Sequence, residues 1–243
     1  MAACSQAVAD DGTAASLGTQ QVSDWFAPER VSGTLHTVLL LSALSLAPAL
    51  LLMMTSFVRI SIVLALLRQA LGTPGVPSNQ VLAALGLFMT ATIMTPVVTT
   101  IHRDAIVPYQ AKEMDAGEAL ARAKGPLHQF MARQIERTGN ADEVWLFLER
   151  AGLDTETIDS YEEVPFHVIA PAFLLSELKT AFLIGFQIYL PFLVIDLVVS
   201  TVLVAMGLVT VTPTIVSLPS KLLLFVLVDG WHLVVGTMLD SFA

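Results

Sequence analysis

The chain has 243 residues, of which 55% are hydrophobic and 14% are charged, against roughly 25% charged in soluble domains. Its net charge of −9 argues against nucleic acid as a partner, since few basic side chains are available to neutralise phosphates. Its single cysteine, Cys4, excludes an internal disulfide and any cysteine-based zinc site. The mean hydropathy of +0.72 and the clustering of the apolar residues predict an all-α membrane protein that carries a polar insert.

The polar and acidic N-terminal segment, residues 1–33, is predicted to be disordered. It has no Lys or Arg before Arg30 and no early apolar core, so it lacks the features of a secretory signal peptide. The run from Met1 to Cys4 is similar to the end of a signal sequence, which leaves open a start farther upstream.

Residues 34–101 are predicted to form the first apolar helical hairpin. Its first apolar stretch is too long for one straight crossing of a bilayer, and we expect Pro48 to kink it and Arg59 to interrupt it. A turn rich in Gly and Pro follows, after which Ser78 or Asn79 can cap the second helix.

The acidic segment 102–165 is predicted to be a small helical insert. It contains seven Lys/Arg and thirteen Asp/Glu, a net charge of −6, which favours the side of the membrane opposite the cytoplasm. We expect a helix break at 139–142 and a second short helix over 143–151. The apolar residues expected on one face of the first helix are Leu127, Phe130, Met131 and Ile135.

Residues 166–243 are apolar almost to the end and are predicted to form a second hairpin plus a closing helix. Three prolines divide this segment. We expect the hairpin to consist of helices over 168–190 and 192–211, and the closing helix to span 221–239.

Five charged side chains interrupt the second apolar segment, and Arg59 interrupts the first. A charge at the depth of a membrane span costs about 2.5–3.5 kcal/mol on insertion scales, so each is expected to have a partner. Helical spacing points Glu177 and Lys179 about 200° apart and separates Lys221 and Asp229 by roughly 12 Å of rise, so we expect the partners on other helices or other subunits. The five residues are Glu177, Lys179, Asp196, Lys221 and Asp229.

Three roles for these charges stay open at this point: ion pairs that hold an oligomer together, a proton or ion relay, and the polar lining of a conduit. An intramembrane aspartyl protease is disfavoured, because its Tyr-Asp and Gly-x-Gly-Asp motifs are absent around Asp196 and Asp229. The five histidines lack metal-ligand spacing, and there is no phosphate-binding loop or nucleophile elbow. The sequence therefore predicts no catalytic residues, no cofactor and no metal site.

The run from Gly207 to Pro213 reads as an apolar, mostly β-branched link between two helices. In a pore-forming oligomer such a link can form a constriction; otherwise it is an ordinary loop.

Several long motifs together resemble those of the FliP family of flagellar export-gate proteins, which has counterparts in injectisome type III secretion systems. The resemblance covers about residues 37–242. The motifs are Met54-Thr55-Ser56-Phe57-Val58-Arg59-Ile60, Arg68-Gln69-Ala70-Leu71-Gly72-Thr73, Pro77-Ser78-Asn79-Gln80, Phe130-Met131-Ala132-Arg133-Gln134, the run from Pro171 to Phe186, Pro191 to Val199, and Lys221 to Trp231.

The resemblance implies a non-enzymatic subunit of a protein export gate in the bacterial inner membrane, at the flagellar basal body. In that family the hairpins assemble into a helical oligomer with five copies of this subunit, together with FliQ-like and FliR-like subunits. FlhA, FlhB and the basal-body membrane ring lie nearby, unfolded flagellar proteins pass through the centre, and much of the complex stands on the periplasmic side.

The resemblance also assigns the pore constriction, or gasket, to Met206, Gly207, Leu208, Val209 and Thr210. The family usually has three methionines after the Met-Gly pair, and methionine adapts to varied chains because it is flexible. Here Leu208-Val209-Thr210 follows, and two of the three positions are β-branched and stiffer. An ion-coupled or proton-coupled secondary transporter or channel, with the buried charges as a relay, is the alternative, and a purely structural scaffold is a third class.

Overall fold

The computed structural model describes residues 28–73, 75–153 and 160–242, and every regular element in these ranges is helical. The all-α prediction is confirmed for this part of the chain. The elements are α2 (Pro28–Met53), α3 (Phe57–Leu71), α4 (Asn79–Ile101), a π-helical turn (His102–Ile106), α5 (Val107–Gln110), α6 (Ala116–Thr138), α7 (Ala141–Arg150), a 3-10 turn (Tyr161–Glu163), α8 (Phe166–Ala205), α9 (Pro213–Leu227) and α10 (Gly230–Asp240).

The chain divides into two compact units, Met1–Leu50 and Leu51–Ala243. The described part of the first unit is the portion of α2 that ends at Leu50. Of the segment predicted to be disordered, residues 1–27 lie outside the described chain, whereas residues 28–33 belong to α2, so that part of the prediction is wrong.

The interruption of the first apolar stretch lies at Met54–Ser56, before its predicted position at Arg59. α2 continues through Pro48, and Arg59 lies within the first turn of α3. The physical reason is Thr55: its hydroxyl donates to the carbonyl oxygen of Leu52 at 2.7 Å and accepts from the amide of Phe57 at 3.3 Å. This side chain satisfies backbone groups on both sides of the break, which Pro48 and Arg59 cannot do.

The second hairpin predicted around Pro191 is also wrong. α8 runs unbroken for 40 residues through Pro171 and Pro191, and its turn follows at residues 206–212. Proline removes one intrahelical hydrogen bond, whereas a loop in this apolar run would leave several backbone groups without partners, so the helix continues. The predicted closing helix is divided as well: α9 and α10 meet at an angle of 63°.

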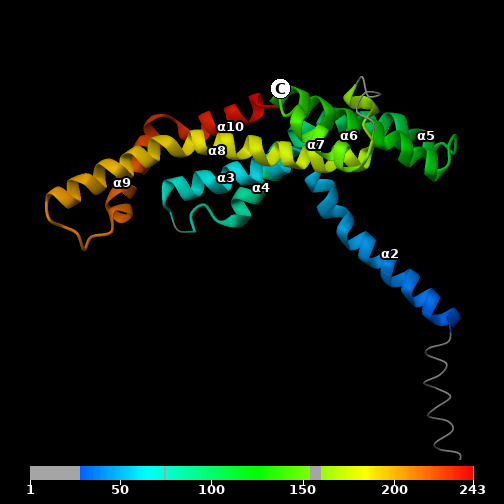
Figure 1. Cartoon of the computed structure of the whole chain (residues 1–243), viewed down its shortest axis with the longest axis horizontal. Coiled ribbons are helices and arrows are strands. Elements are labelled where there is room, and N and C mark those ends of the chain that lie inside the picture. The colour runs from blue at the N-terminus through cyan, green and yellow to red at the C-terminus, as the bar shows by residue number, and fades with distance from the viewer. Residues whose placement is uncertain (1–27, 74, 154–159, 243) are drawn as a thin grey trace, which may run out of the picture. The chain divides into compact units, whose positions relative to one another are not determined.

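The core of the second unit forms where α3 packs along α8 and where α6 and α7 cover the N-terminal half of α8. Figure 1 shows α6 and α7 near one end of α8 and α9 at its other end. The predicted amphipathic face of α6 is confirmed, because Phe130, Met131 and Ile135 are buried and Leu127 packs against the same core. Burial of each large apolar side chain contributes about 1.5–3 kcal/mol. The side chains that this core buries almost completely include Ile60, Val63, Leu64, Leu67, Met131, Ile135, Leu148, Ile169, Ala172 and Phe173.

The α3–α8 contact depends on a glycine. A Cβ atom at Gly185 would lie 2.2 Å from Cδ1 and 3.2 Å from Cβ of Leu66. The two helices can therefore approach this closely only because residue 185 has no side chain.

We expect Gly185→Val to lower the free energy of unfolding by about 1–3 kcal/mol, because the added side chain forces α3 away from α8. Thermal unfolding of the purified chain in detergent measures this loss. Gly236→Val is the matched control, since a Cβ atom there meets no atom within 4 Å. Equal unfolding temperatures for the two variants would contradict the proposed close contact.

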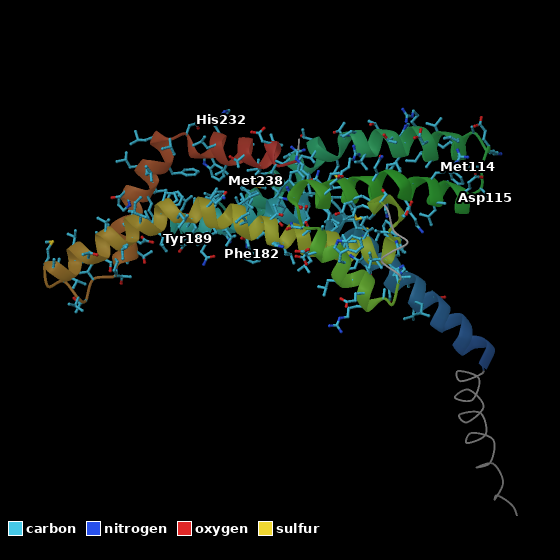
Figure 2. All side chains as sticks on the ribbon, turned by 45° about the horizontal axis from the view of Figure 1, so that its top comes forward. Met114, Asp115, Phe182, Tyr189, His232 and Met238 are labelled. Atoms are coloured by element: carbon cyan, nitrogen blue, oxygen red, sulfur yellow. The ribbon has the colours of Figure 1, made fainter. Side chains whose placement is uncertain are left out.

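Two helical stretches of the described chain are long and apolar enough to cross a membrane, one from Asn79 to Gln110 and the other α8; each of two bent helix pairs could add a further span. In the most apolar window of each stretch, only 33% and 11% of the residues are buried, respectively. Figure 2 shows Phe182 and Tyr189 along α8, and Phe182 is 58% exposed. Such surfaces require lipid or neighbouring protein.

Candidate functional site: two ion pairs and an apolar loop

Arg59 on α3 and Glu177 on α8 form an ion pair in the core. Nε of Arg59 donates to one carboxylate oxygen at 2.8 Å and Nη2 donates to the other at 2.5 Å. Both side chains are 0% exposed. This bidentate geometry is the strongest arrangement open to a guanidinium and a carboxylate, and it links the two central helices.

The remaining donors of Arg59 reach the end of the chain and the insert. Nη1 donates to the carbonyl and to the hydroxyl oxygen of Ser241, each at 3.1 Å, and Nη2 lies 3.4 Å from Oε1 of Gln134 on α6. The guanidinium also lies 3.9 Å from the ring centroid of Phe242. One buried cation thus contacts α3, α6, α8 and the residues that follow α10.

A second ion pair joins α8 to α9. Nζ of Lys221 donates to Oδ2 of Asp196 at 2.7 Å and to the carbonyl oxygen of Ala70 at 3.0 Å. Ser217 donates its hydroxyl to the other oxygen of Asp196 at 2.6 Å. Ala70 lies in the last turn of α3, where carbonyl groups lack intrahelical partners, so Lys221 caps α3 while it pairs with α8.

Two residues predicted to be buried charges are exposed in the single chain. Lys179 points toward the insert, where its Nζ lies 3.2 Å from Oε1 of Glu143 on α7, and its side chain is 55% exposed. Asp229 lies at the break before α10 with a φ of 50° and is also exposed. Lys179 departs from the predicted pattern because α8 turns one side away from the core, and Asp229 departs from it because it lies at the bend between α9 and α10. A role in subunit contacts stays a prediction for both.

The loop between α8 and α9, residues 206–212, carries an exposed apolar surface. Gly207, at a φ of 75°, ends α8: its amide donates to the carbonyl of Val204 at 3.0 Å, and that of Leu208 donates to the carbonyl of Leu203 at 2.9 Å. This is the Schellman pattern, and it requires a residue that tolerates the left-handed region. Met206 is 66% exposed and Val209 is 78% exposed.

Comparison with known proteins places these features in a family. The model of the FliP family matches residues 40–238. The chain belongs to the FliP family. The Flagellar biosynthetic protein FliP of Pectobacterium carotovorum subsp. carotovorum is 48% identical over 209 residues, which cover 86% of this chain and 79% of that protein. The protein of the same name from Bacillus subtilis (strain 168) is 44% identical over 215 residues, 88% of this chain and 95% of that protein.

The FliP family resemblance therefore holds over residues 40–238, and its motifs contain the ion-pair residues Arg59, Glu177, Asp196 and Lys221. No group of three or more His, Cys, Asp or Glu side chains able to hold a metal ion is found in residues 28–73, 75–153 and 160–242.

Sequence reasoning missed the neutral partners of these charges. Gln134 ends the FliP-like motif at residues 130–134, but nothing in the sequence pairs it with Arg59. Ser217 precedes Lys221 by one helical turn, a spacing that could have indicated a shared partner. Asn140, at the predicted helix break, donates its amide to the hydroxyl oxygens of Ser176 at 2.9 Å and Thr180 at 3.2 Å, which fixes α7 to α8.

Proposed function

We propose that this chain is a core subunit of the flagellar type III protein export gate in the bacterial inner membrane. With FliQ-like and FliR-like subunits and further copies of itself, five in the family, it forms the conduit through which unfolded flagellar proteins cross. FlhA, FlhB and the basal-body membrane ring adjoin it, and the acidic insert lies on the periplasmic side. The printed name of its relatives, Flagellar biosynthetic protein, supports a role in flagellar biosynthesis.

The observation that carries this proposal is the exposed apolar loop at residues 206–212. A loop whose residues are all exposed in the single chain is suited to contact other copies and a passing polypeptide. We assign the constriction to Met206, Gly207, Leu208, Val209 and Thr210. No enzymatic step is part of this proposal.

The alternative function, an ion-coupled transporter or channel, needs buried charges that can exchange protons along a path. In the described chain, Arg59 and Glu177 are locked in a bidentate pair with 0% exposure, and Lys221 pairs with Asp196. These contacts favour fixed links between helices over a relay.

We expect photo-crosslinking residues introduced at positions 208–210 to capture a flagellar export substrate stalled in the gate. The loop meets the passing chain if it forms the constriction. The matched control is position 120: Leu120 is 60% exposed but lies on α6 in the insert. Motile variants that give no substrate adduct from any of positions 208, 209 and 210 would contradict the assignment.

A further inference from the structure

A pocket of about 560 Å³ lies between α4 and α6, beside the end of the chain. Its volume is within the range of about 300–1,000 Å³ that is usual for ligand sites. One wall is apolar and comes from the membrane-type helix α4; the other comes from the charged helix α6. The lining includes Ile93 and Val97 of α4, Arg133, Gln134 and Arg137 of α6, and Phe242.

Two arginines one helical turn apart face this pocket. Arg133 and Arg137 are both exposed, and neither forms an ion pair with any residue in 28–73, 75–153 or 160–242. Arg133 donates only its Nε, to the carbonyl of Gln129 at 3.3 Å. Two guanidinium groups are therefore free to bind an anion in a pocket that has one apolar wall. Asp104, the carboxylate of the adjoining hollow, is already paired with Arg103.

The pocket lies beside the C-terminal end of the uncharged part of α4. Thr92, Thr95 and Thr99 are exposed in the second half of the helix, together with Val98, and the exposed Arg103–Asp104 pair follows. In the first half, the exposed side chains include Val81, Leu87 and Phe88. Arg103 and Asp104 are the first charged residues after α4, and Asp104 lines the adjoining hollow, so the uncharged run of this helix ends close to the pocket. The end of such a run in a membrane helix lies near the membrane–water interface, where lipid phosphates lie.

We propose that the pocket binds an anionic phospholipid, with the lipid phosphate held by Arg133 and Arg137 and the acyl chains along the exposed face of α4. Arginine binds phosphate oxygens through paired N–H donors, and basic pockets next to membrane helices bind anionic head groups. The proposal does not rest on the export function.

A phospholipid fits better than a free anion or the carboxylate of a second copy. Half of the pocket wall is apolar, which a free phosphate leaves uncovered, and the neighbouring face of α4 continues that apolar surface. Gln134 and Phe242 in the pocket wall also contact Arg59, so a bound lipid lies against the residues that hold the core ion pair.

The test uses the full chain purified in a neutral detergent, with dioleoyl phosphatidylglycerol as the probe. We expect the double variant Arg133→Gln/Arg137→Gln to bind this lipid about tenfold more weakly for each arginine removed. Dioleoyl phosphatidylcholine, which has the same chains, is expected to bind the unaltered protein at least about tenfold more weakly than phosphatidylglycerol. Native mass spectrometry over a lipid titration measures both differences.

Arg122→Gln is the control variant, because Arg122 is an exposed arginine of the same helix that already pairs with Glu118 at 2.8 Å. It is expected to leave lipid binding unchanged. Equal binding of the two lipids, or unchanged binding by the double variant, would overturn the proposal. Competition by glycerol 3-phosphate as strong as that by the lipid would indicate a free-anion site instead. Loss of self-association with no change in lipid binding would indicate a second copy as the occupant.

Discussion

Replacing Glu177 with glutamine is expected to lower the free energy of unfolding by about 3–5 kcal/mol. The substitution keeps the shape of the side chain but leaves the guanidinium of Arg59 buried without a counter-charge. The neutral oxygens of Gln134 and Ser241 remain, and they do not offset the cost of burying a cation. Thermal unfolding in detergent measures the loss, and motility on soft agar reports whether the protein still functions.

The double variant Arg59→Met/Glu177→Met distinguishes a structural link from a proton or ion relay. Removing both charges removes the desolvation cost as well, so we expect it to be more stable than Glu177→Gln. If the pair only links helices, the double variant also regains part of the motility. Arg122→Gln, which loses an exposed pair with Glu118, is the control and is expected to change stability by less than about 1 kcal/mol. A stable double variant without any motility would favour the relay alternative.

The ion pair between Arg59 and Glu177 shows which part of the site the sequence predicts and which part it does not. A charge in an apolar run predicts a partner on another helix, and spacing alone rules out partners such as Lys179 for Glu177. Spacing cannot name that partner, because Arg59 and Glu177 are 118 residues apart and meet only through the packing of α3 on α8.

Pro191 and Gly207 show why the second hairpin was misplaced. Proline restricts the chain locally, but a long apolar helix tolerates it because a loop at the same place would leave more backbone groups without partners. Gly207 can adopt the left-handed conformation that closes the end of α8, so the turn forms there. The position of the turn thus depends on where the backbone groups find hydrogen-bond partners. A proline alone does not indicate that position.

Exposure was the least predictable property of the charges. Lys179 and Asp229 occur in the same apolar runs as Glu177 and Lys221, yet both are exposed in the single chain. α8 is apolar on all sides although only a small part of its most apolar window is buried. Its sequence therefore has no periodic pattern that indicates which side faces the core. The neutral groups around each ion pair, such as Gln134, depend on the same packing.

Replacing Lys221 with methionine is expected to lower the free energy of unfolding by about 2–3 kcal/mol, less than the loss at Glu177. Methionine fills the space but leaves the carboxylate of Asp196 with Ser217 alone and the carbonyl of Ala70 without its capping donor. The cost is smaller because the side chain of Asp196 is 29% exposed and water can solvate part of its charge. The same purified protein in detergent provides the measurement.

This lysine also bears on the loop, because Lys221 is the side chain that ties α9 to both α8 and the end of α3. With Lys221 removed, Ser217 still links α9 to Asp196, but α9 is held less firmly beside the loop at 206–212. We therefore expect substrate adducts from positions 208–210 to fall along with motility. Lys179→Met is the matched control: it removes a lysine of α8 that is 55% exposed, and it is expected to change stability by no more than about 1 kcal/mol. If Lys221→Met and Lys179→Met were equally stable, the link between α3, α8 and α9 would not depend on this ion pair.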